Sequence, residues 1–133
     1  MSQARNPYEI HDYPSRRPTG VGPWTLAFAL FGGTIAWTVH LIAGYSVANY
    51  MCGDAVAVWI LHGLTVVALT VVALAFLTAL RVVRHATRLP KGERTPEEDR
   101  DQFLASGGLL LAGLGFMAIT FGEVAVVVAG CTP

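Results

Sequence analysis

The stretch AVAVWILHGLTVVALTVVALAFLTAL, residues 55–80, decides the fold of this chain. It contains no Asp, Glu, Lys or Arg. An α-helix rises about 1.5 Å per residue, so about 20 apolar residues cross a bilayer core about 30 Å thick. The stretch exceeds that length, and we therefore predict a transmembrane helix here.

Two more blocks have the same character: WTLAFALFGGTIAWTVHLIAGYSV (24–47) and FLASGGLLLAGLGFMAITFGEVAVVVAG (103–130). Charged residues make up 14% of the chain, against roughly a quarter in soluble proteins. We predict an all-α integral membrane domain over residues 24–130, with transmembrane helices at 24–47, 55–80 and 103–130. Residues 81–102 would form a loop in which TPEED predicts a short surface helix, capped by Thr95, that runs into the third transmembrane helix.

The basic residues are placed asymmetrically. All 9 Lys and Arg residues lie before Trp24 or within 81–102. The positive-inside rule puts these segments in the cytoplasm, and residues 48–54 and the C-terminal end, 131–133, outside. No apolar stretch precedes Trp24, so a cleaved signal peptide is not expected. We predict a multi-pass protein of the bacterial cytoplasmic membrane.

The only two cysteines, Cys52 and Cys131, then lie on the same outer side. That compartment is oxidising in bacteria, which favours a disulfide between them, with two free thiols as the alternative.

The N-terminal segment, residues 1–23, has four prolines within NPYEIHDYPSRRPTGVGP and should be an extended cytoplasmic tail. We expect a partner subunit to order it through Tyr8, Ile10, Tyr13, Arg16 and Arg17. A nucleic-acid role is not expected, because acidic residues offset the basic ones in 81–102.

A polar cluster is predicted inside the membrane. The alternating direction of the helices brings His40, His62 and Glu123 to a similar depth, in the outer third of the bilayer. Helical spacing places Thr65 and Ala73 on the same face as His62, and Phe116 on the same face as Glu123. A charged side chain within the bilayer is costly, so Glu123 should face protein or water.

The cluster leaves several interpretations open. His40 and His62 could be the axial ligands of a haem b between the first two helices. With Glu123 they could bind a metal ion as a His-His-Glu set. They could also line a quinone pocket or a proton path, or serve only as hydrogen-bond partners between helices or with a neighbouring subunit.

No catalytic motif is present, and the protein is not expected to be an enzyme. Aromatic residues near the ends of the apolar blocks are typical of membrane interfaces; these are Trp24, Tyr45, Tyr50 and Trp59. Trp37 lies deeper and should pack on a neighbouring helix.

The pattern resembles a group of small bacterial three-helix membrane proteins whose genes lie near those for caa3-type haem-copper cytochrome c oxidases. The matching residues are Trp37, His40, Tyr45, Cys52, His62 and Cys131. This resemblance implies an electron-transport setting, without implying a mechanism.

One function is favoured by four features: the small size, the lack of catalytic motifs, the glycine-rich helices that can pack closely, and the N-terminal tail. It is that of a non-catalytic accessory or assembly subunit of a respiratory or photosynthetic complex, in contact with larger subunits and lipid. The first alternative is a small redox module that binds haem b or quinone through His40 and His62. The second is transport of protons or small molecules by an oligomer.

Overall fold

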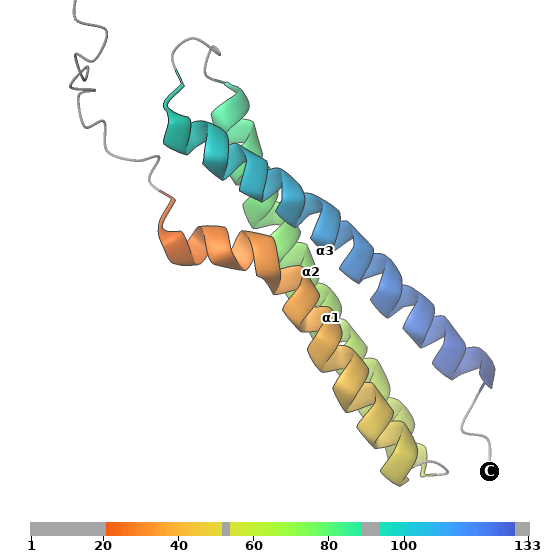
Figure 1. Cartoon of the computed structure of the whole chain (residues 1–133). Coiled ribbons are helices and arrows are strands. Elements are labelled where there is room, and N and C mark those ends of the chain that lie inside the picture. Colours follow the sequence, from red (N-terminus) through yellow and green to blue (C-terminus); the bar gives the residue numbers. More distant parts are fainter. Residues whose placement is uncertain (1–20, 52–53, 89–93, 130–133) are drawn as a thin grey trace, which may run out of the picture.

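The computed structural model describes residues 21–51, 54–88 and 94–129, with side chains described as far as Val124. These residues form three α-helices: α1 (Pro23–Met51), α2 (Ala55–Thr87) and α3 (Pro96–Ala129) (Figure 1). Each helix packs against the other two. All three are long and apolar enough to cross a membrane, which confirms the predicted all-α class and its three candidate spans.

The helices extend beyond the apolar blocks, and this corrects the predicted loop at 81–102. Helix α2 continues to Thr87, and α3 begins at Pro96 rather than at Phe103. Extending an existing helix adds one hydrogen bond for each residue fixed and needs no new nucleus. Polar residues next to an apolar span can therefore prolong it until a breaker intervenes.

The start of α3 is fixed by a capping box. The Thr95 N–H donates to the Glu98 carboxylate at 2.9 Å, and the Glu98 N–H donates to the Thr95 hydroxyl at 3.3 Å. Pro96 occupies the first helical position, where the missing N–H has no intrahelical acceptor to lose. The predicted cap at Thr95 is confirmed, and its helix runs without a break into the third candidate span.

Small residues fill the interface between the helices. On α2 a buried residue recurs every three or four positions: Ala57, Leu61, Thr65, Ala68, Val72, Ala75, Ala79, Val82 and Ala86. On α3 the buried positions include Ala105, Gly108, Ala112, Gly115 and Ile119. This spacing is that of helices packed at a shallow angle along one seam.

Two residues expected on the inner faces lie outside the seam. Ala73 is exposed, and Phe116 is 49% exposed. Gly115 takes the inner place instead, and a methyl group there would lie 3.1 Å from the Gly33 carbonyl oxygen. A phenyl ring does not fit between backbones that are this close.

Helices α1 and α3 touch through their backbones. A methyl group added at Gly108 would lie 2.3 Å from the Ala29 carbonyl oxygen, and one added at Gly33 would lie 2.8 Å from the Ala112 Cα.

Helix α1 also bends within its N-terminal half, the half that holds the pair Gly32–Gly33 (Figure 1). Glycine pairs are common sites of helix bending because they leave the backbone unsupported by side chains.

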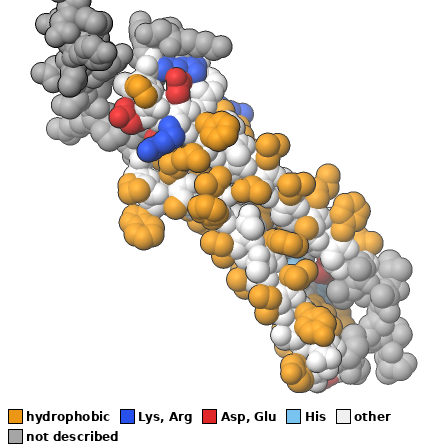
Figure 2. All heavy atoms as spheres, in the orientation of Figure 1, with side chains coloured by type: hydrophobic (Ala, Val, Ile, Leu, Met, Phe, Trp, Pro, Cys, Tyr) orange, Lys and Arg blue, Asp and Glu red, His pale blue; other side chains and the backbone are white. Residues whose placement is uncertain are grey.

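Most apolar side chains point away from the bundle. Figure 2 shows hydrophobic side chains over the length of the visible face, with Lys and Arg gathered where α2 ends and α3 begins. A protein in water rarely leaves so much apolar surface uncovered, so this surface matches a lipid or protein environment.

Candidate functional site

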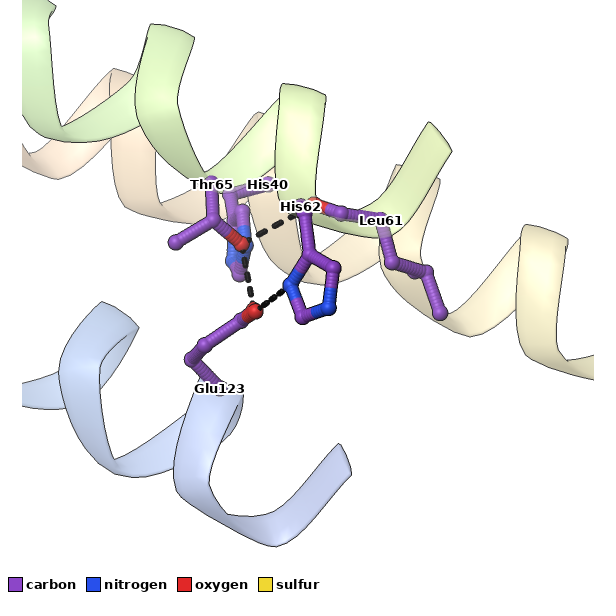
Figure 3. A network of polar contacts seen from close by, with 5 residues as sticks. All are labelled: His40, Leu61, His62, Thr65 and Glu123. Carbon is purple, nitrogen blue, oxygen red and sulfur yellow. Dashed lines mark hydrogen bonds and ion pairs between the residues drawn. The ribbon is translucent and has the colours of Figure 1, made fainter. Parts of the chain in front are cut away.

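The structure brings the predicted polar residues together near the end of the bundle where α1 ends and α2 begins (Figure 3). His40 comes from α1, His62 from α2 and Glu123 from α3. Thr65, one turn after His62 on α2, lies among them.

Glu123 uses both carboxylate oxygens. Its Oε1 is hydrogen-bonded to Nδ1 of His62, and its Oε2 accepts a hydrogen bond from the Thr65 hydroxyl at 2.6 Å. The two partners share one face of α2, so this side chain alone ties α3 to α2 at two points. Hydrogen bonds to a carboxylate are stronger than those between neutral groups.

The Thr65 hydroxyl has three oxygen or nitrogen neighbours but only one proton. It lies 2.6 Å from Glu123, 3.0 Å from the Leu61 carbonyl oxygen and 3.0 Å from Nε2 of His40. The carboxylate is both the nearest and the strongest acceptor, so we assign the proton to that bond. Nε2 of His40 then donates to Thr65, which makes His40 the link from α1.

The four side chains form one continuous chain of hydrogen bonds: His62, Glu123, Thr65, His40. Thr65 is buried, whereas the side chains of His62 and Glu123 are 42% and 22% exposed. The hydrogen-bond chain therefore passes from the partly exposed His62 through the buried Thr65 to His40, which is again partly exposed. Such an arrangement can fix three helices to one another and can hold a proton between imidazole and carboxylate groups.

Sequence reasoning placed Thr65 on the face of His62 but did not include it in the cluster. A helical Thr usually satisfies its hydroxyl on the carbonyl four residues earlier. Thr70 does so, with its hydroxyl 2.7 Å from the Val66 carbonyl oxygen. The Thr65 hydroxyl also lies within hydrogen-bond distance of the carbonyl four residues earlier, so only the position of α1 and α3 distinguishes it.

The geometry bears on two interpretations that the sequence left open. Within the described residues, no group of three His, Cys, Asp or Glu side chains is placed to hold a metal ion. Thr65 stands between His40 and Glu123, and it supplies the bonds that a metal ion would supply. A haem held by His40 and His62 needs both rings to face one space, but His40 lines a cavity beside the cluster and His62 does not.

A cavity of about 550 Å³ lies beside the cluster. All three helices contribute to its wall, which includes Trp37, His40, Thr65 and Glu123 but not His62. Trp37 also packs against the buried residues of the bundle, as predicted.

The four aromatic residues predicted at the membrane interfaces are all exposed: Trp24, Tyr45, Tyr50 and Trp59. Two other predictions lie outside the described residues. They are the Cys52–Cys131 disulfide and the docking tail with Tyr8, Ile10, Tyr13, Arg16 and Arg17. Comparison of the chain with protein families, with curated proteins and with solved structures found no match.

Proposed function

We propose that this chain is a non-catalytic subunit of a larger electron-transport complex in the bacterial cytoplasmic membrane. The observation that carries the proposal is the division between its interior and its surface. The interior is filled mainly by alanine and glycine, with a few larger apolar side chains and a polar cluster that joins the three helices, while most large apolar side chains lie on the outside. The resemblance in Trp37, His40 and Tyr45 supports the electron-transport setting.

The orientation follows from charge. Arg81, Arg84 and Arg88 lie at the end of α2, and Arg94 and Arg100 lie at the start of α3. The positive-inside rule places this end in the cytoplasm. The polar cluster is then near the outer face. A reporter enzyme that is active only outside the cytoplasm, fused after Pro133, tests this: its activity supports the orientation, and its inactivity refutes it.

The packing favours a subunit over a channel. The backbone contacts between Ala29 and Gly108 and between Gly33 and Ala112 close the bundle in its middle. A water-filled path along the axis of one chain would have to pass this point. Transport would therefore have to occur between chains of an oligomer.

The mechanism of such a subunit is lateral packing. Outward positions without a side chain allow a neighbouring helix to approach closely. Gly63 on α2 and Gly113 on α3 are such positions, since no atom lies within 4 Å of the place their methyl groups would take. Contacts there would position the chain at the lipid-facing or quinone-facing edge of the larger subunits.

Purification tests the role. A tagged chain is extracted from its own membranes in a mild detergent and separated by size. The proposal expects it to co-migrate, in fixed stoichiometry, with larger subunits that carry haem or another redox centre. A chain that runs alone at every detergent concentration, after cross-linking as well, would refute it.

A further inference from the structure

The cavity beside the polar cluster has the properties of a ligand site. Its volume of about 550 Å³ lies within the range of roughly 300–1,000 Å³ that is usual for small-molecule pockets. Most of its wall is apolar, and its polar groups include His40, Thr65 and Glu123, with hydroxyls from Tyr45 and Ser46. An apolar wall with a few convergent polar groups is the common pattern of such pockets.

The cavity opens toward the apolar surface of the bundle. Leu41, Ile42 and Tyr45 form part of its wall and are also exposed hydrophobic residues, each more than half exposed. These residues belong to a helix of membrane-spanning length and hydropathy. A ligand would therefore enter from the hydrocarbon phase, and it must have an apolar body.

The charged residues in the cavity wall restrict the charge that the head group of a ligand can carry. No Lys or Arg lines the cavity, while the Glu123 carboxylate does. A phosphate or another anion would be repelled by Glu123 and would find no cation to compensate for lost hydration. The head must be neutral, and it must offer hydroxyl or carbonyl groups to the polar side of the wall.

Two features favour a planar ring. Trp37 and Tyr45 both line the cavity, and aromatic side chains pack well against flat π-systems. His40 and Glu123 offer different hydrogen-bonding properties. The carboxylate accepts from a hydroxyl, and an imidazole can either donate to a carbonyl or accept from a hydroxyl.

We propose that this cavity binds the head group of a quinone or quinol from the lipid phase, with His40 and Glu123 as its hydrogen-bonding partners. The oxidised ring accepts the hydrogen bond from Nε2 of His40 in place of Thr65, and the reduced ring donates to Glu123. The apolar tail leaves the cavity past Leu41 and Ile42. This site is a property of the chain alone, so it does not depend on the proposed partner subunits.

Trp37 provides the measurement, because quinones quench tryptophan fluorescence at short range. The full chain, with Trp24 and Trp59 changed to Phe, is reconstituted in lipid nanodiscs and titrated with decylubiquinone and with a short-chain menaquinone. We expect saturable quenching of Trp37 by at least one of them. The reference is a chain that keeps only Trp59, in which quinone dissolved in the lipid should quench without saturation.

A matched pair of variants locates the site. Gly122 and Gly113 both lie on α3 and both have open space where a side chain would start, but only Gly122 lines the cavity. Gly122→Leu should abolish saturable quenching, and Gly113→Leu should leave it unchanged. His40→Leu should weaken oxidised quinone binding roughly tenfold, the factor expected for one lost hydrogen bond of ordinary strength. Circular dichroism confirms that each variant is folded.

Three results would overturn the proposal. The first is unsaturable quenching of Trp37 equal to that of Trp59. The second is saturable quenching that survives Gly122→Leu. The third is native mass spectrometry that shows a phospholipid retained by the parent chain, lost in Gly122→Leu and not displaced by either quinone, which would assign the cavity to lipid.

Discussion

Replacing Gly108 by alanine should force α1 and α3 apart. The added methyl group would lie 2.3 Å from the Ala29 carbonyl oxygen, 2.9 Å from its carbonyl carbon and 3.2 Å from the Leu30 Cα. All three atoms belong to the backbone, so no side-chain rotation relieves the overlap. Gly113→Ala is the matched control, because nothing lies within 4 Å of its methyl position on the same helix.

The magnitude follows from the overlap. Carbon and oxygen atoms settle roughly 3.5 Å apart, so the helices must separate by about 1 Å, and a gap of that size forfeits a quarter to a half of each dispersion contact. Overpacking of this kind costs about 1–3 kcal/mol. Alanine regains up to about 1 kcal/mol of helix propensity at either position. The propensity term cancels between the two variants, so we expect Gly108→Ala to be about 1–3 kcal/mol less stable than Gly113→Ala.

Reversible unfolding in bicelles, followed by steric trapping of a doubly labelled chain, measures this difference directly. The parent chain and both variants are compared in the same lipid mixture, and helix content is checked by circular dichroism. Equal free energies of unfolding for the two variants would refute the close contact between α1 and α3.

Three further outcomes are expected. Thr65→Val should lower the free energy of unfolding by about 1–3 kcal/mol in the same assay, because His40 and Glu123 both lose a hydrogen-bond partner. Thr70→Val, the control, should change the free energy of unfolding little. Equal effects of the two substitutions would contradict the hydrogen-bonded cluster. Thr95→Ala should cost about 1 kcal/mol and speed hydrogen exchange in the first turn of α3, and unchanged exchange would argue against the capping box. If Cys52 and Cys131 form the predicted disulfide, both thiols should be alkylated in the denatured chain only after reduction, as read by mass spectrometry.

Some features of this protein followed from the sequence alone. The three apolar blocks predict three helices because the free energy of transfer into a membrane is a sum over the residues of a segment. This sum depends little on which other segments the helix contacts. The similar depth of His40, His62 and Glu123 followed in the same way, from helix rise and alternating direction. Thr95 predicted the start of a helix at its position because N-capping is a local interaction.

Only the tertiary structure decided which sides of the helices meet. Gly115 faces α1 while Phe116 faces outward, although the two are adjacent. Thr65 joins the cluster while Thr70 does not, although each hydroxyl lies within hydrogen-bond distance of the carbonyl four residues earlier. Successive residues along a helix point about 100° apart, so neighbours in the sequence face different sides. When a helix is apolar on all sides, its hydropathy does not indicate which side faces the other helices. The close backbone approach of α1 and α3 at Gly33 and Gly108 fits only one rotation of each helix.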